Sequence, residues 1–268
     1  SAANTYTGST TISAGTLQLN PGGTISSSSS IINNAALVYA NNIVNTANGV
    51  TGSGTIGVNS GSTLQLTGAL GTTGLVTINF GVLDLNGQSS TSSISLAGTG
   101  ISSAGALINS SATAATQSGN VALSAATSIG GTGNITISGI ISGGNALTKV
   151  AANTLTLSGA NTYTGSTTIS AGTLSISAAN NLSSAAVTIN GGTLVSTGTA
   201  TITNAITLGT GGGTIAAASG QTLTVSGIIS GANALTVGSA GNTGTVALSG
   251  ANTYTGSTTI SAGTLSIS

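Results

Sequence analysis

Residues 157–177 read LSGANTYTGSTTISAGTLSIS, and residues 248–268 repeat the same string without a change. The tyrosines of the two copies, Tyr163 and Tyr254, are therefore 91 positions apart. A third copy opens the chain as SAANTYTGSTTISAGTLQLN over residues 1–20. Related lead-in segments begin at Gly139, with GIISGGNALTKV, and at Gly227, with GIISGANALTV. Repetition on this scale is typical of architectures in which each unit packs on its neighbours.

A shorter period lies inside the long repeat. Ile169 and Leu174 recur as Ile189 and Leu194, 20 positions further on. Segments such as LSIS, LTLS and VTIN alternate apolar with small polar residues, which is the pattern of a half-buried β-strand. Gly, Asn and Ser between them favour tight turns. No window has the spacing of an amphipathic helix, so we expect no helices.

These periods predict an all-β fold, namely a parallel β-helix or β-solenoid with coils of roughly 20 residues. The Ile, Leu and Val side chains would point inward and stack into a narrow core, and the Ser, Thr and Asn side chains would face water. A β-sandwich also fits the alternation, but it does not predict the 20-residue registration. We expect one continuous solenoid over residues 1–268, with units at approximately 1–138, 139–226 and 227–268.

The sequence carries few of the side chains on which chemistry depends. Its 268 residues include one lysine (Lys149) and one aspartate (Asp84), with no Arg, Glu, His or Cys. Acid–base catalysis needs positioned titratable groups, and zinc or calcium sites need His, Cys or several carboxylates. Nucleic-acid affinity comes from Lys and Arg on phosphates. We therefore expect no enzyme activity, no cofactor, no metal site and no nucleic-acid partner.

Two local patterns point to a cofactor or a membrane only formally. The string Gly52-x-Gly54-x-x-Gly57 matches a dinucleotide fingerprint, but a predicted strand follows where the motif needs a helix. The most apolar stretch, residues 31–44, is interrupted by asparagines and is shorter than the ~18 apolar residues of a membrane helix. We expect no transmembrane segment in this part of the chain.

The lead-in and the repeated string together resemble the passenger-associated β-strand repeat of bacterial autotransporters. The resemblance rests on I-S-G-x-x-x-L-T-K followed by T-L-T-L-S-G-A-N-T-Y-T-G-x-T-T-I-x-A-G-T-L, which runs from Ile141 to Leu174 with Lys149 at the lysine position. Residues 229–265 form a looser copy without the lysine, and residues 1–17 hold the second half. The resemblance implies a right-handed β-helix outside a Gram-negative-type cell, exported through an outer-membrane barrel that lies outside this segment.

Tyr6, Tyr163 and Tyr254 share one position of the repeat and are the candidate site residues. One interpretation is packing or turn capping at a fixed place in the coil, and the other is an aromatic platform for sugars. The pair Thr154-x-Thr156 resembles the flat hydroxyl arrays of ice-binding β-helices, although such pairs do not recur on every coil.

The two charged residues are expected at the surface. Asp84 lies between Leu83 and Leu85 at an outward strand position, and lone charges are usually exposed. We expect Asp84 and Lys149 to be solvated.

Composition and repetition together favour a non-catalytic extracellular structural protein, a stalk, fibre or filament at the bacterial cell surface. The alternative is an adhesin that binds glycans or surfaces through its Tyr or Thr/Ser faces. The first and last residues, Ser1 and Ser268, both lie within the repeated motif. We therefore expect either a continuation of the array or head-to-tail self-association into a filament.

Overall fold

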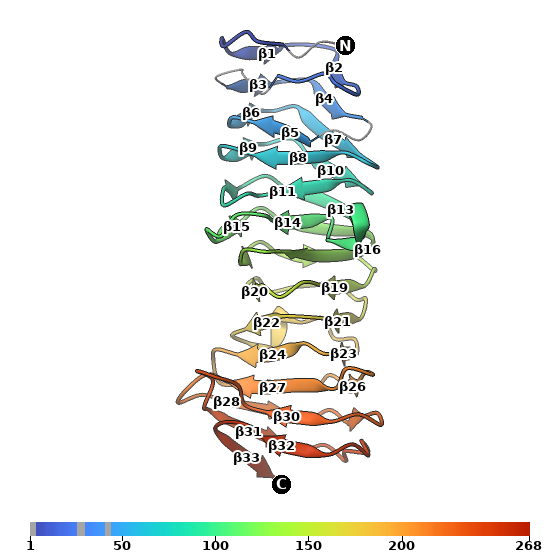
Figure 1. The fold of residues 1–268 in the computed structure, drawn as a ribbon, viewed down its shortest axis with the longest axis vertical. Helices are drawn as coiled ribbons and strands as arrows, with labels where there is room; N and C mark the ends of the chain where they lie inside the picture. The colour runs from blue at the N-terminus through green and yellow to red at the C-terminus, as the bar shows by residue number, and fades with distance from the viewer. Residues whose placement is uncertain (1–3, 26–29, 41–43) are drawn as a thin grey trace.

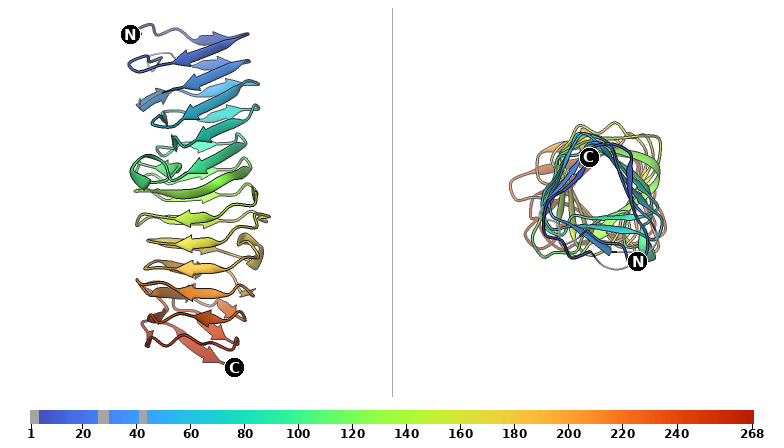
Figure 2. Two further views of the ribbon diagram at one scale, coloured as in Figure 1. Left: turned by 90° about the vertical axis from the view of Figure 1, so that its right-hand side faces the viewer. Right: turned by 90° about the horizontal axis from the view of Figure 1, so that it is seen from above.

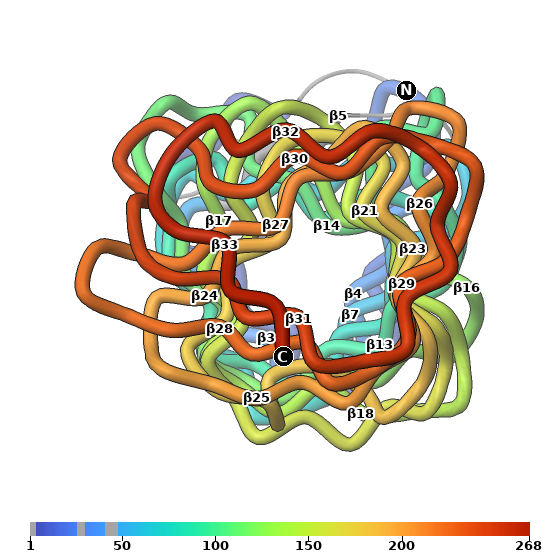
Figure 3. The backbone as a smooth tube through the Cα atoms, turned by 90° about the horizontal axis from the view of Figure 1, so that it is seen from below, coloured from blue at the N-terminus to red at the C-terminus, as the bar shows by residue number. Residues whose placement is uncertain are grey.

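The computed structural model describes residues 4–25, 30–40 and 44–268. The chain winds into an elongated stack of coils, with the N-terminus at one end and the C-terminus at the other (Figure 1). The stack has about 12 coils of about 20 residues each. The two further views show strands of successive coils lying above one another, and along the axis the coils superpose (Figures 2 and 3). The predicted parallel β-solenoid is confirmed.

Three sheets form the faces of the stack among the described residues. The first sheet has 13 strands, in the order β1 (Thr10–Ile12), β3 (Ile31–Asn33), β6 (Val50–Gly52), β9 (Leu70–Thr72), β12 (Ser89–Ser90), β15 (Ala115–Gln117), β17 (Ile135–Ile137), β20 (Thr154–Leu157), β22 (Thr173–Ile176), β24 (Thr193–Ser196), β27 (Gly213–Ala217), β30 (Leu235–Val237) and β32 (Thr258–Ile260).

The second sheet has 16 strands in the described part of the chain. Its main path is β2 (Thr16–Leu19), β4 (Ala36–Tyr39), β7 (Thr55–Asn59), β10 (Val76–Asn79), β13 (Ile94–Gly98), β16 (Val121–Gly131), β19 (Leu147–Lys149), β21 (Thr167–Ile169), β23 (Val187–Ile189), β26 (Ile206–Leu208) and β29 (Ile229–Ser230). A side path of β5 (Val44–Ala47), β8 (Thr63–Leu66), β11 (Val82–Asp84) and β14 (Leu107–Asn109) joins at β16, which also pairs with β18 (Ile141–Ser142). The third sheet is β25 (Ala200–Ile202), β28 (Thr222–Val225), β31 (Thr245–Leu248) and β33 (Thr264–Ile267).

Strand pairing is parallel and follows the coil period. Leu155 pairs with Leu174, and Leu174 pairs with Leu194, steps of 19 and 20 residues. The step widens to 27 residues between Ser90 and Gln117, where a loop leaves the stack. Since a step close to 20 recurs on coil after coil, the registration that separated a solenoid from a sandwich is present in the molecule.

The core is a set of aliphatic columns that run along the axis. One column in the first sheet is built from residues that pair in register and are fully buried: Ile135, Leu155, Leu174, Leu194, Ile215 and Val237. Removing each such side chain from water stabilises the fold by roughly 1.5–3 kcal/mol. The inward positions are the apolar members of the alternating pattern.

Two short turns depart from the expectation of no helices. They are the 3-10 helices η1 (Ile101–Ser103) and η2 (Ala179–Asn181). The Asn181 side chain closes η2, because its Oδ1 accepts hydrogen bonds from the backbone N–H groups of Ser177 and Ala178, both at 2.8 Å. Both helices among the described residues are single turns, far too short to span a bilayer. Gly52 ends β6 and Gly57 lies inside β7, so a strand follows the glycine string as expected.

Candidate functional site

The candidate site is the corner that carries the repeated tyrosine. Between β20 and β21 the segment 161–166 crosses one face of the stack without forming a strand. The Tyr163 hydroxyl is hydrogen-bonded to Thr167 Oγ1 at 2.7 Å, and Thr167 is the first residue of the next strand. The other two copies repeat this bond, at 2.7 Å between Tyr6 and Thr10 and at 2.8 Å between Tyr254 and Thr258. All three predicted tyrosines therefore have the same local geometry.

The three tyrosines differ in exposure. Tyr163 is 1% exposed, Tyr254 is half-buried and Tyr6 is 44% exposed. The next coil covers Tyr163 with Leu182 and Ser183, both buried. Burial raises the pKa of Tyr163, and hydrogen bonds with Thr167 and Ser183 act in the opposite sense. The ring of Tyr163 is thus part of the packing between coils, and a ligand could reach the ring face of Tyr6 more easily.

The asparagine of the same motif links three successive coils. Asn161 Oδ1 accepts a hydrogen bond from the backbone N–H of Ile141 at 2.8 Å, and its Nδ2 donates to the carbonyl of Asn181 at 2.6 Å. Asn252 accepts in the same way from Ile229 at 2.8 Å. Sequence reasoning missed this role, although the recurrence of Asn two residues before each tyrosine was a visible signal. The amide supplies the bonds that a strand would otherwise make at this corner.

The glycine of the motif allows the coils to approach closely. A Cβ atom on Gly165 would lie 2.1 Å from the carbonyl oxygen of Asn145 in the preceding coil. A Cβ atom on Gly256 would lie 2.2 Å from the carbonyl group of Asn233. Gly8, at the same motif position, has no atom within 4 Å of such a Cβ. The glycine is therefore required where a preceding coil lies against it.

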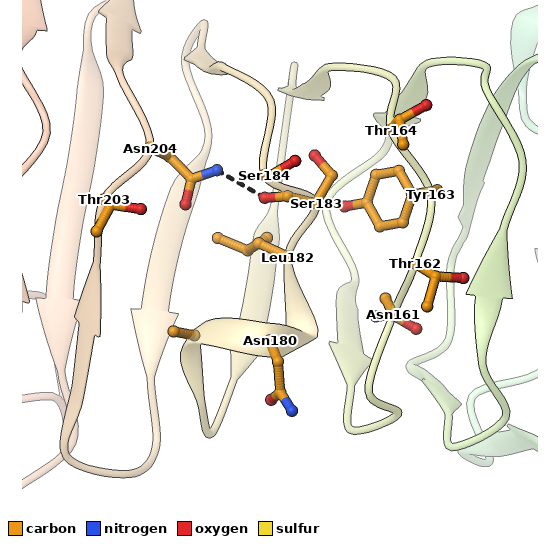
Figure 4. A pocket seen from close by; sticks show the side chains of 11 residues that line it. Asn161, Thr162, Tyr163, Thr164, Asn180, Leu182, Ser183, Ser184, Thr203 and Asn204 are labelled. Carbon is orange, nitrogen blue, oxygen red and sulfur yellow. Dashed lines mark hydrogen bonds between the residues drawn. The ribbon is translucent and has the colours of Figure 1, made fainter.

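A shallow pocket of about 350 Å³ lies beside the Tyr163 corner. It is formed by loops of three successive coils, and its side chains are shown in Figure 4. Asn204 Nδ2 donates to the carbonyl of Ser183 at 2.7 Å, so this amide is engaged in structure. The groups left at its exposed rim are the hydroxyls and amide of Thr162, Thr164, Asn180, Ser184 and Thr203. Such a lining could hydrogen-bond an uncharged, hydroxylated ligand.

Asp84 is buried, so its expected place on the solvated surface is wrong. The carboxylate is 2% exposed, even though Leu83 and Leu85 on either side of it point into the core. One oxygen accepts hydrogen bonds from Gln65 Nε2 at 2.8 Å and Ser110 Oγ at 2.6 Å. The other accepts from the backbone N–H groups of Asn86 and Ser110, both at 3.0 Å. Neighbouring coils supply these donors, which replace water around the charge.

Lys149 is also buried, and its predicted exposure is wrong for a different reason. Its side chain is 0% exposed and points inward, in register with Ile129 on one side and Ile169 on the other. The sequence held a signal for this position, because Lys149 aligns with Val237 in the following unit, and Val237 is fully buried. Asp84 and Lys149 lie on different strands, β11 and β19, and each is held by uncharged groups.

Threonines form a regular ladder that the sequence did not reveal. On the first sheet one outward position holds threonine in six consecutive coils, each paired in register with the next: Thr154, Thr173, Thr193, Thr214, Thr236 and Thr259. Thr156 has Ser175 and then Val195 as its partners, so the paired Thr-x-Thr array does not continue. The hydroxyls therefore lie in a single file along the axis, with adjacent strands about 4.8 Å apart.

Comparison with known proteins agrees with the repeat. The passenger-associated-transport-repeat family matches residues 1–19, 147–176 and 240–267, the segments with the three tyrosine corners. Residues 1–3 of the first copy lie outside the described residues. A search of the curated proteins and a search of the solved structures both found no match. The three repeat matches and the parallel β-solenoid together fit a β-helix repeat protein of the autotransporter passenger class.

Proposed function

We propose that this chain is a rigid, non-catalytic stalk segment of a passenger exported to the bacterial cell surface. The observation that carries the proposal is the unbroken ladder of the first sheet, which runs from β1 to β32 with every strand paired to the next. A continuous ladder couples each coil to both neighbours, so bending would break hydrogen bonds and separate the core columns. The family match supports the exported setting.

The burial of both charged side chains supports the non-catalytic part of the proposal. Asp84 and Lys149 are the chain's only carboxylate side chain and only amine side chain, and each has its polar atoms in hydrogen bonds to uncharged groups. A general acid or base must reach a substrate proton, and buried groups held in this way do not. Chemistry by this segment would need groups from elsewhere.

Electron microscopy of the intact surface protein tests the stalk. Coils spaced by about 4.8 Å make a stack of twelve roughly 60 Å long, and we expect this segment to be a straight rod of constant width. Small-angle scattering of the purified segment should give the same length. A compact particle, or a hinge within residues 30–260, would contradict the proposal.

An adhesin remains the second candidate because of the threonine ladder. A file of half-exposed hydroxyls with one period could bind an uncharged polymer along the axis, and an uncharged surface suits such a ligand. Binding to neutral polysaccharides can be compared between the parent chain and a triple variant, Thr173→Val, Thr193→Val and Thr214→Val. The matched control is Thr222→Val with Thr245→Val, which are paired on the third sheet. Binding lost only in the triple variant would favour the adhesin, and no binding by the parent chain would favour the stalk alone.

Self-association is a further part of the proposal. With Asp84 and Lys149 buried, the molecule offers no exposed charged side chain to hold copies apart. Low surface charge favours association. Sedimentation velocity over a range of protein concentrations should therefore reveal species larger than the monomer. A single monomeric species at all concentrations would contradict this part.

A further inference from the structure

The interior position of Lys149 raises the question of what neutralises its charge. Lys149 ends β19 and occupies an inward column that continues through Ile169, Ile189 and Leu208. All of these residues are buried. An ammonium group placed in such a column is costly unless polar atoms surround it.

Oxygen atoms surround the ammonium group at the corner after β19. Lys149 Nζ donates to the carbonyl oxygens of Val150 at 2.7 Å and Ala151 at 2.8 Å, and to Asn153 Oδ1 at 2.8 Å. A fourth oxygen, the carbonyl of Ala171 in the next coil, lies at 3.3 Å. The chain's carboxylate, Asp84, is engaged elsewhere with Gln65, Asn86 and Ser110. These four neutral oxygens are the type of donor set that holds a monovalent cation.

Two backbone features show that the corner is arranged around the cation. Ala151 adopts a left-handed conformation with φ of 63°, which is unfavourable for a residue with a Cβ atom and brings its carbonyl to the ammonium. Asn153 is 6% exposed, and its Nδ2 donates to the carbonyl of Gly133 at 2.7 Å. Asn153 therefore joins the ammonium to the preceding coil, and Ala171 joins it to the following one.

The second repeat unit provides an internal comparison without a cation. Val237 takes the place of Lys149, and eight positions separate it from Thr245, whereas five separate Lys149 from Thr154. The longer loop closes on itself, since the backbone N–H of Asn242 donates to the carbonyl of Ser239 at 2.9 Å. Gly238, with φ of 78°, makes the turn. This corner satisfies its own backbone groups with a local turn, so it needs no ammonium.

We propose that the oxygens of Val150, Ala151, Asn153 and Ala171 form a monovalent-cation site that the chain fills with its own Lys149 ammonium group. The ammonium takes the role that a local turn has in the second unit, and it lets a short loop connect β19 to β20. A free cation of similar size, ammonium or potassium, would occupy the same oxygens if the side chain were removed.

Thermal unfolding of Lys149→Ala in matched concentrations of ammonium, potassium or lithium chloride tests the site. We expect this variant to melt several degrees higher in ammonium or potassium chloride than in lithium chloride, and the parent chain to show no such difference. The control Val237→Ala removes an equivalent buried side chain and should melt at one temperature in all three salts. A folded Lys149→Ala variant with the same melting temperature in all three salts would overturn the proposal.

A measurement on the parent chain covers the case in which Lys149→Ala does not fold. The chain has one lysine, so a ¹⁵N–¹H correlation of side-chain ammonium groups contains at most one lysine signal. An ammonium enclosed by four oxygens should exchange its protons with water slowly enough to give a visible signal at neutral pH. Exchange as fast as that of a solvent-exposed lysine would show that the ammonium is not enclosed, and the proposal would be wrong.

Discussion

At the scale of single residues, the repeated motif is explained by contacts between coils. Asn161 bonds to the coils on both sides of it, and Tyr163 bonds to Thr167, which is fully buried. A buried hydroxyl that loses its partner costs more than the bond itself contributes. The structural role of the motif tyrosine should therefore depend on how deeply its copy is buried.

The first prediction compares two copies of that tyrosine. Tyr163→Phe removes the partner of the buried Thr167 hydroxyl and should lower the free energy of unfolding by about 1–2 kcal/mol. Tyr254→Phe removes the same bond where Thr258 is exposed, and should change it by less than about 0.5 kcal/mol. Urea denaturation of both variants measures the difference. Equal losses would show that burial of the corner does not matter.

The second prediction concerns the pH dependence of stability through Lys149. Burial lowers the pKa of Lys149 to about 8 in the folded chain, against 10.5 for an ordinary lysine. Between these two values the unfolded chain binds more protons than the folded chain, so stability rises with pH. From pH 7.5 to pH 9.5 we expect a gain on the order of 1–2 kcal/mol. The tyrosines titrate above this range, which keeps the window clean.

Urea denaturation at the two pH values measures this gain. Lys149→Met is the matched control, because it keeps a long unbranched side chain in the column but has no proton to lose. The gain should vanish in the variant. A parent chain whose stability falls between pH 7.5 and pH 9.5 would contradict the sign.

At the scale of elements, the sequence predicted the strands and the coil period but not their alignment. Alternation identified LTLS and LSIS as strands, and the 20-residue shift from Leu174 to Leu194 is a true register pair. The threonine ladder could not be found in this way, because the step from coil to coil varies with loop length. The step is 19 residues from Leu155 to Leu174 and 23 from Val237 to Ile260. Register therefore had to come from the structure.

The burial of the two charged residues was missed for physical reasons that differ. The position of Lys149 was readable, since it aligns with the core residue Val237, but the general rule that charges are exposed points the other way. Asp84 does lie at an outward position, as the alternation predicts. Its burial depends on donors from Gln65 and Ser110, which are 19 and 26 residues away in the sequence. Only the stacking of coils brings those donors together.

The third prediction uses the motif glycine to test the close approach of coils. Gly165→Ala would place a methyl group against the Asn145 carbonyl, so the two coils must separate, and we expect a loss of about 2–3 kcal/mol. Gly8→Ala is the matched control at the same motif position, with open space around the added atom. Its effect should be within about 0.5 kcal/mol. Denaturant unfolding of both variants decides the matter, and a Gly165→Ala chain as stable as Gly8→Ala would contradict the packing.

At the scale of the whole molecule, the stack hides every side chain that a charge-specific protease would recognise. Lys149 is the only residue after which trypsin can cut, and it lies in β19 with β16 and β21 paired on either side. A protease needs several residues in an extended, accessible conformation, which these strands cannot provide without opening.

The fourth prediction is therefore resistance of the folded chain to trypsin. The native protein should stay intact over hours, whereas the urea-unfolded protein should give two fragments, residues 1–149 and 150–268. Gel electrophoresis with mass spectrometry follows both reactions. Rapid cleavage after Lys149 under native conditions would show that β19 is not held in the stack.

The most direct test of the account is the coil register itself, measured by disulfide formation in a chain that has no cysteine of its own. Thr173 pairs with Thr193, and Thr193 pairs with Thr214. Adjacent strands lie about 4.8 Å apart, within the Cα separation that a disulfide spans, and strands two coils apart do not. The solenoid predicts that Thr173→Cys with Thr193→Cys forms an intramolecular disulfide under mild oxidation, and that Thr173→Cys with Thr214→Cys does not. A disulfide in the second pair and none in the first would contradict the parallel stack of 20-residue coils.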